Sequence, residues 1–174
     1  MSASSSNAEP GSIMADVYLS IGSNIDPDTH IPAALDDLRS AFGPLSQSSI
    51  YETAAVGFDG PPFHNLVVRL ASDLSPLDLA RRLREIEERH GRTRESRKFS
   101  SRTLDVDLIL CGDAVLDAGS IKLPRDEITR YAFVLEPLAE IAPDRRHPVL
   151  GETYAKLWRD FDKTGLRQRR LPTA

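Results

Sequence analysis

The sequence has a single cysteine, Cys111, among its 174 residues. One thiol excludes an internal disulfide and a cysteine-rich zinc site, and it is typical of a protein of the reducing cytosol. No apolar run approaches the ~20 residues that a membrane-spanning helix needs. Residues 1–13 have neither a basic start nor an apolar core, which argues against a secretory signal. We therefore expect a cytoplasmic protein without a membrane partner.

The chain has no excess of positive charge, with 22 Lys and Arg against 26 Asp and Glu, and the formal net charge is −4. This balance argues against a general nucleic-acid-binding protein. The apolar share of 40% and the charged share of 28% are typical of a globular chain, and the length suits one domain with a proper core. Residues 1–13 are small, polar and without periodicity, so we expect a disordered tail followed by one domain over residues 14–174. We expect this domain to be a monomer.

Strand and helix patterns alternate along the expected domain. The strand patterns run from Asp16 to Ile21 before a turn at Gly22-Ser23-Asn24, from Leu45 to Thr53, from Asn65 to Leu70, from Thr103 to Leu110 and from Ser120 to Leu123. The helix patterns run from Thr29 to Ala41, from Ser75-Pro76 to Gly91, from Phe133 to Ile141 and around Tyr154 to Trp158. The order β-α-β-β-α-β predicts an α+β fold of the ferredoxin-like type, a four-stranded antiparallel sheet with helices packed on one face, here with a C-terminal extension.

A basic segment leads directly into an apolar strand that carries two carboxylates. Five cationic side chains fall within eleven residues: Arg92, Arg94, Arg97, Lys98 and Arg102. The strand's period of two places Asp105 and Asp107 on one face and the aliphatic residues between them on the other. Arginine binds phosphate oxygens bidentately, and two carboxylates on one face can share one or two hard cations. The segment predicts a phosphate and metal site, although a solvated linker beside solvent-facing carboxylates would have the same composition.

Four blocks of sequence occur in a recognisable order over about residues 15 to 160. They are Tyr18-Leu-Ser-Ile-Gly-Ser-Asn24, Tyr51-Glu-Thr53 with Gly57 and Asn65, Gly91-Arg-x-Arg94 with Ser101-Arg-Thr-Leu-Asp-Val-Asp-Leu108, and Phe133-Val-Leu-Glu-Pro-Leu-Ala-Glu-Ile-Ala-Pro143. In these blocks the chain resembles the 6-hydroxymethyl-7,8-dihydropterin pyrophosphokinases. The resemblance implies transfer of pyrophosphate from ATP to the hydroxymethyl group of a reduced pterin in folate biosynthesis, giving AMP and the pterin diphosphate. It also implies two Mg²⁺ ions and ATP as co-substrate.

The resemblance implies a role for each matching residue. The implied catalytic residues are Arg92, Arg102, Asp105 and Asp107, of which Asp105 and Asp107 hold the metal ions. The implied pterin contacts are Thr53, Ala54, Val56, Phe63, Asn65 and Phe133, with the pterin between the rings of Phe63 and Phe133. The implied nucleotide contacts are Glu87, Arg92, Arg94, Phe99, Arg102, Leu108 and Arg125. For the two phenylalanines core packing is the alternative, and for Asn65 it is a turn.

The chain departs from the family's pattern at three places. Phe99 stands where tryptophan is common, and Ala54 and Phe63 stand where proline and tyrosine are often seen. Residues 125–131 lack the usual histidine-containing sequence, and either Arg125 or Arg130 could supply the cation missing there. These departures leave open a binding module without catalysis, and a pyrophosphokinase that acts on a modified pterin. The complete set of arginines and aspartates opposes the binding module, which has no need of paired metal ligands.

Overall fold

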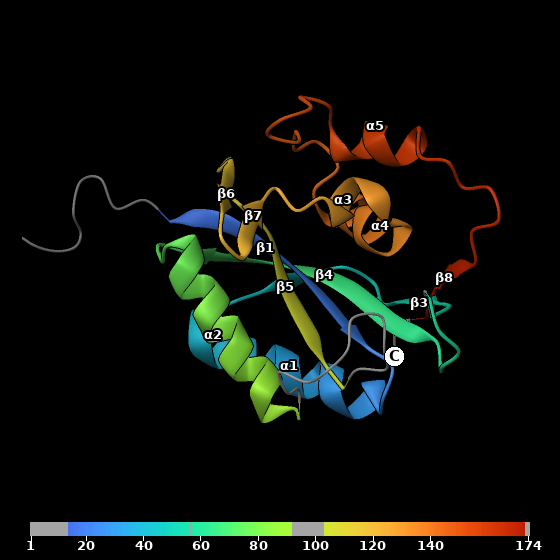
Figure 1. The fold of residues 1–174 in the computed structure, drawn as a ribbon, viewed down its shortest axis with the longest axis horizontal. Coiled ribbons are helices and arrows are strands. Elements are labelled where there is room, and N and C mark those ends of the chain that lie inside the picture. Colours follow the sequence, from blue (N-terminus) through green and yellow to red (C-terminus); the bar gives the residue numbers. More distant parts are fainter. Residues whose placement is uncertain (1–13, 56, 92–102, 173–174) are drawn as a thin grey trace, which may run out of the picture.

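The computed structural model describes residues 14–55, 57–91 and 103–172. Within them the chain has a mixed α/β architecture, with an antiparallel sheet between helices (Figure 1). The main sheet has the strand order β5–β1–β4–β3–β8, and β2 also pairs with β4. Its strands are β1 (Ala15–Ser23), β2 (Ser46–Gln47), β3 (Tyr51–Thr53), β4 (Phe63–Ser72), β5 (Asp105–Cys111) and β8 (Gln168–Arg170). A second sheet is formed by β6 (Leu116–Ala118) and β7 (Ile121–Leu123).

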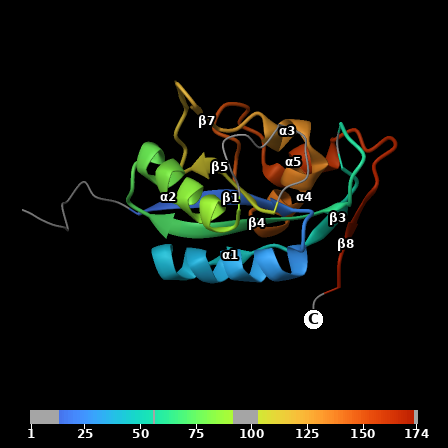
Figure 2. The ribbon, with the colours of Figure 1, turned by 60° about the horizontal axis from the view of Figure 1, so that its bottom comes forward.

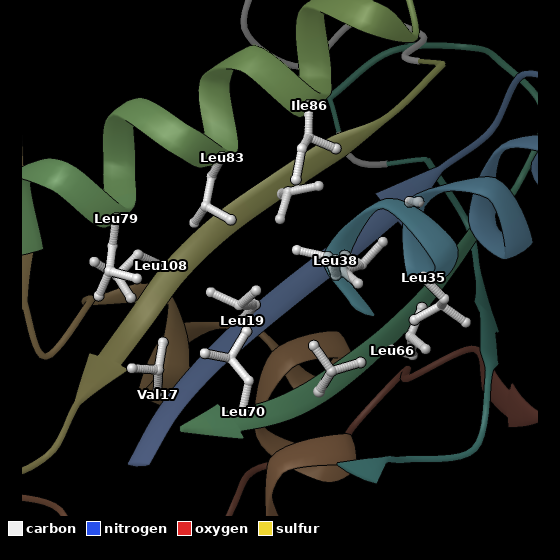
Figure 3. Close-up of a cluster of buried hydrophobic side chains, with 14 of the residues drawn as sticks. Val17, Leu19, Leu35, Leu38, Leu66, Leu70, Leu79, Leu83, Ile86 and Leu108 are labelled. Carbon is white, nitrogen blue, oxygen red and sulfur yellow. The ribbon is translucent and has the colours of Figure 1, made fainter. Parts of the chain in front are cut away.

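One face of the main sheet packs against α1 (Pro27–Phe42) and α2 (Pro76–Arg89). Both helices have apolar residues at helical spacing, and burial of that stripe is what stabilises them on the sheet. Figure 3 shows the stripes directed at the strands, with Leu35 and Leu38 from α1 and Leu79, Leu83 and Ile86 from α2. The predicted helices at Thr29–Ala41 and from Ser75-Pro76 onwards are confirmed.

Helix α2 begins where its capping residues predict. The Ser75 hydroxyl accepts a hydrogen bond from the Asp78 backbone N–H at 3.2 Å, and Pro76 occupies the first turn, where its missing N–H costs nothing. The helix ends at Arg89, directly before the basic segment. These local interactions fix the helix that runs beside β5.

The opposite face of the sheet is also covered, so the expectation of helices on one face was wrong. It packs against α3 (Glu127–Arg130), α4 (Ala132–Ile141) and α5 (Tyr154–Arg159), as Figure 2 shows. The physical reason lies in the strands, because Tyr18 of β1 and Val67 of β4 are apolar and point to the face that α1 and α2 leave open. A sheet that is apolar on both faces needs two layers of helices.

The single strand predicted from Leu45 to Thr53 is two short strands, β2 and β3. Between them the hydroxyl of Ser48 accepts a hydrogen bond from the Val67 backbone N–H at 2.9 Å, in place of a backbone carbonyl. The next residue, Ser49, donates instead to the Glu140 carboxylate of α4. Side-chain hydrogen bonds of this kind compete with the ladder, and here they interrupt it.

The C-terminal residues add a strand that the sequence did not predict. Strand β8 pairs with β3, and residue Leu171 donates from its backbone N–H to the Ile50 carbonyl at 2.8 Å. No strand was predicted there because an edge strand of three residues carries almost no local signal. In the described ranges, no helix is long and apolar enough to cross a membrane.

Candidate active site

Three neighbouring strands meet at Gly22. This residue pairs with Asn65 of β4 on one side and with Asp105 of β5 on the other. Residues that pair directly in an antiparallel ladder point to the same face, so Asn65 and Asp105 share a face with only a glycine between them. Two strand spacings of ~4.8 Å put their Cα atoms about 10 Å apart. The result is a strip of sheet at Gly22 with an amide on one side and a carboxylate on the other.

Gly22 itself was expected in a turn, and this expectation was wrong because β1 continues through Ser23. A Cβ atom on Gly22 would lie 2.7 Å from the Oδ1 atom of Asn65 and 3.8 Å from the Cδ1 atom of Phe63. Only glycine therefore leaves room for the Asn65 amide at this point. A glycine within a strand pattern often marks a place where another group comes close to the backbone, and this signal could have predicted the role of Gly22.

Three of the predicted pterin contacts, Thr53, Phe63 and Asn65, lie together on β3 and β4. The Asn65 amide donates to the Thr53 hydroxyl at 2.9 Å, and both side chains are buried. Thr53 pairs across β3 and β4 with Phe63, whose ring meets that of Phe58 edge-on at a centroid distance of 6.4 Å. Ala54 follows β3 and is exposed. The strands thus hold an amide, a hydroxyl and a half-buried ring on one face.

Phe133, another predicted pterin contact, lies in the first turn of α4. It is half-buried, and its ring stacks on that of Tyr131 at a centroid distance of 5.0 Å and an interplanar angle of 19°. The stacking gives the ring a fixed orientation at the helix N-terminus. Phe63 and Phe133 therefore belong to different elements, β4 and α4, and each has an aromatic neighbour from its own part of the chain.

Asp105 and Asp107 occupy the same sheet face as Asn65. Asp107 pairs with Ser20 of β1, two residues before Gly22, and both aspartates are half-buried. The intervening Val106 is buried in the opposite core. The predicted alternation of carboxylates and aliphatic residues along β5 is confirmed.

Glu87 fixes the free edge of β5. Its Oε2 atom accepts a hydrogen bond at 2.7 Å from the backbone N–H of Val106, the residue between the two aspartates. β5 is the end strand of the sheet that the described residues form, so among them this N–H has no neighbouring strand to donate to. The resemblance implied only that Glu87 lies near the nucleotide. The sequence did not predict that Glu87 also holds the strand of Asp105 and Asp107 against α2.

A pocket of about 130 Å³ lies beside β5. It brings together three of the predicted nucleotide contacts with one of the aspartates: Glu87, Leu108, Arg125 and Asp107. Residues of α2 and of the segment 120–122 complete its wall. This volume is below the ~300–1,000 Å³ of pockets that enclose a whole drug-sized ligand, so it suits one part of a larger molecule.

Arg125 is the half-buried cation of this pocket, whose wall also holds the exposed Arg84 and Lys122. Its guanidinium donates to Glu127 at 2.7 and 3.1 Å, and its backbone N–H donates to the Ile109 carbonyl of β5 at 3.1 Å. The hydrogen bonds to Glu127 raise the pKa of Arg125; burial opposes this rise and the charge of Asp107 adds to it. Arg130, the other candidate, is exposed at the end of α3. The position in the pocket wall therefore favours Arg125 over Arg130 as the cation expected in residues 125–131.

The donor set on β5 fits a hard cation. Asp105 and Asp107 offer only oxygen, and nowhere in the described ranges do three or more His, Cys, Asp or Glu side chains gather as a metal site. Mg²⁺ is usually held by one or two carboxylates together with water and substrate phosphates, whereas structural Zn²⁺ needs four protein ligands. The remaining predicted site residues lie outside the described residues: Val56, Arg92, Arg94, Phe99 and Arg102.

The chain matches a known protein family. A family model for 7,8-dihydro-6-hydroxymethylpterin-pyrophosphokinase (HPPK) matches residues 18–143. The chain is 41% identical over 140 residues to a 2-amino-4-hydroxy-6-hydroxymethyldihydropteridine pyrophosphokinase of Pseudomonas aeruginosa, which covers 76% of this chain and 83% of that protein. It is 32% identical over 150 residues to the protein of the same name from Aquifex aeolicus, with coverage of 85% and 91%.

Among solved structures, the chain is similar to the Plasmodium falciparum HPPK-DHPS crystallised with pteroate. The TM-score is 0.69 at 14% sequence identity, so this likeness concerns the fold. It covers 84% of this chain but 42% of the Plasmodium chain, so this chain spans less than half of that protein. On the family match and the bacterial relatives, the chain belongs to the 7,8-dihydro-6-hydroxymethylpterin-pyrophosphokinase (HPPK) family.

Proposed function

We propose that this protein transfers the β,γ-pyrophosphoryl group of ATP to the hydroxymethyl group of 6-hydroxymethyl-7,8-dihydropterin, giving AMP and the pterin diphosphate in folate biosynthesis. The observation that carries the proposal is the pairing of Asn65 and Asp105 with the two sides of Gly22. Pyrophosphoryl transfer requires an acceptor hydroxyl and a metal-bound triphosphate to meet in line. An amide and a carboxylate that could bind a metal, on one face and about 10 Å apart, suit that requirement.

The acceptor side of the face is formed by Thr53, Phe63, Asn65 and Phe133. A pterin is flat, with an amide-like edge that both donates and accepts hydrogen bonds. The hydrogen bond to Thr53 holds the Asn65 amide in one orientation, so that it can read such an edge without first being ordered. The rings of Phe63 and Phe133 offer apolar surface to the faces of the pterin. Ala54 and Val56 are the further contacts that the resemblance implies.

The donor side is formed by Asp105 and Asp107 with the neighbouring pocket. The two carboxylates would hold Mg²⁺, which when bound neutralises charge on the ATP phosphates and on the attacking oxygen. Glu87 keeps their strand in register, which matters because a misplacement of 1 Å can cost about 100-fold in rate. Arg125 and Leu108 would contact the nucleotide in the pocket. Arg92, Arg94 and Arg102, with Phe99 beside them, stay predicted contacts of the phosphates.

The proposal also covers the fold type, the domain organisation, the location in the cell and the oligomeric state. The strand order β5–β1–β4–β3 with α1 and α2 on one face supports a ferredoxin-like βαββαβ unit over a single domain from residue 14, followed by a C-terminal extension. The single cysteine and the net charge of −4 support a cytoplasmic monomer that does not bind nucleic acid.

Product analysis tests the proposal. The protein is mixed with ATP, Mg²⁺ and 6-hydroxymethyl-7,8-dihydropterin, and the nucleotides are separated by chromatography. We expect AMP that appears only when the pterin is present, in a ratio of one to the pterin diphosphate. ADP in place of AMP would mean a simple kinase, and ligand binding without any nucleotide product would mean a binding module; either result contradicts the proposal.

A further inference from the structure

The C-terminal strand β8 lies beyond residues 18–143, to which the family model extends. It pairs with β3 in a register that sets Gln168 opposite Thr53 and Arg170 opposite Tyr51. Gln168 and Thr53 therefore point to the same face of the sheet, the face of the candidate active site. Strand β3, which carries Thr53, is thus itself paired with the C-terminal strand β8.

The Gln168 side chain connects this edge of the sheet to α4. Its Nε2 atom donates to the Ala132 carbonyl at 3.1 Å and to the Glu136 Oε1 atom at 2.8 Å. Ala132 is the first residue of α4 and directly precedes Phe133. One amide group thus joins the strand next to Thr53 to the helical turn that carries the Phe133 ring.

We propose that Gln168 is a positioning residue of the acceptor pocket, which fixes the separation between the Thr53 wall on β3 and the Phe133 wall on α4. The inference rests on the proposed function, because it takes these two walls to enclose the pterin. A planar ligand held between side chains of two elements needs those elements at one spacing. Gln168 supplies a link between them near the start of α4, through Ala132 and Glu136.

A second contact between β3 and α4 limits what the loss of Gln168 can do. One turn further along α4, the Glu140 carboxylate accepts a hydrogen bond from the Tyr51 hydroxyl at 2.6 Å and from the Ser49 hydroxyl at 2.9 Å. The Arg170 guanidinium donates to the same Tyr51 hydroxyl at 3.1 Å. Helix α4 therefore stays docked when Gln168 is replaced, and the freedom gained is confined to its first turn.

The neighbouring residue offers a matched control. Arg169 lies on the same strand but points to the other face, where it donates to Glu52 at 3.2 Å. Gln168→Met keeps the length of the side chain and removes both donated hydrogen bonds. Gln168→Lys keeps a donor for Ala132 and Glu136. Arg169→Met removes a polar contact of the same strand without touching α4.

Steady-state kinetics at saturating ATP and Mg²⁺ test the inference. For Gln168→Met we expect the KM for the pterin to rise by about three- to tenfold, the change that loss of one or two hydrogen bonds produces. The KM for ATP should stay at the wild-type value, and Gln168→Lys should recover most of the pterin affinity. Arg169→Met should match the wild type in both KM values, and its melting temperature should be close to that of Gln168→Met.

Two results would overturn the inference while leaving the proposed function intact. One is a Gln168→Met variant with the pterin KM of Arg169→Met. The other is a KM for ATP that rises together with the KM for the pterin, because this would indicate a general structural effect. A wild-type protein that makes no pterin-dependent AMP removes the proposed function and this inference together.

Discussion

Asn65 and Asp105 lie on the same face of the sheet, each paired with Gly22 from opposite sides. In the proposed function, this pairing would divide the candidate active site into an acceptor side on β3, β4 and α4, and a donor side on β5 beside α2. Both sides are held by buried polar contacts, from Thr53 to Asn65 and from Glu87 to β5. The strip at Gly22 is where the two substrates would meet.

Substituting Gly22 by alanine should impair the acceptor side. The new Cβ atom would lie 2.7 Å from the Asn65 Oδ1 atom, so the amide must move and lose its hydrogen bond to Thr53. We expect the KM for the pterin to rise by about tenfold or more, with a smaller change in the KM for ATP. Steady-state kinetics measure both values. Equal changes in the two KM values would contradict the division of the site at Gly22.

Replacing Asp107 by asparagine should abolish most of the activity while the protein stays folded. Asparagine keeps the size of the side chain but removes the charge that a hard cation needs. We expect kcat/KM to fall by about 100-fold or more, with a higher Mg²⁺ concentration at half-maximal rate. Asp117→Asn, which changes an exposed carboxylate on β6, is the control. Near-normal turnover in Asp107→Asn would remove the metal role of β5.

Arg125→Ala should weaken nucleotide binding selectively. The guanidinium lines the pocket beside Asp107 and is the half-buried cation of that wall. We expect the KM for ATP to rise by about tenfold, as for loss of a charge-assisted hydrogen bond, with the KM for the pterin unchanged. Arg130→Ala removes an exposed cation of the same segment and should behave as the wild type. The reverse result would assign the missing family cation to Arg130.

Stability at low pH should depend on Glu140. Burial alone would raise the pKa of this carboxyl, but hydrogen bonds from Tyr51 and Ser49 favour the carboxylate and hold the pKa below its ordinary value of 4.5. The stability that the carboxylate contributes is therefore present above pH 4.5 and is lost as the pH falls through the lower folded-state pKa.

Denaturant unfolding of Glu140→Gln at two pH values measures this contribution. At pH 7 we expect the variant to unfold with a free energy about 1–2 kcal/mol below that of the wild type, and at pH 3 the difference should shrink. Glu85→Gln, which changes an exposed carboxylate on α2, should differ little from the wild type at either pH. A deficit of equal size at both pH values would show that the Glu140 charge contributes nothing.

The sequence predicted the features that local chemistry decides. Helix α2 follows from its cap at Ser75 and its apolar spacing, and the alternation of Asp105 and Asp107 with Val106 follows from the period of a strand. Both signals lie within a few residues of the structure that they determine. The family resemblance predicted which residues form the two sides of the site, because it matches four separate blocks of sequence. A local pattern cannot show that such distant blocks contribute to one site.

The features that were missed depend on pairing between distant segments. Gly22 looks like a turn residue until β4 and β5 are set on either side of it. Glu87 finds its partner only because β5 is the end of the sheet, and β8 is a strand only because β3 offers it an edge. Strand order and register come from the whole fold, so residues whose role depends on them are not visible in a local pattern.

The fate of the β-phosphate of ATP tests the central claim most directly. The protein is incubated with Mg²⁺, 6-hydroxymethyl-7,8-dihydropterin and ATP labelled with ³²P at the β position, and the products are separated by thin-layer chromatography. A pyrophosphokinase moves the β- and γ-phosphates together, so the account predicts label in the pterin diphosphate and unlabelled AMP. Label that stays in a nucleotide as ADP, or label that never leaves ATP, would contradict it.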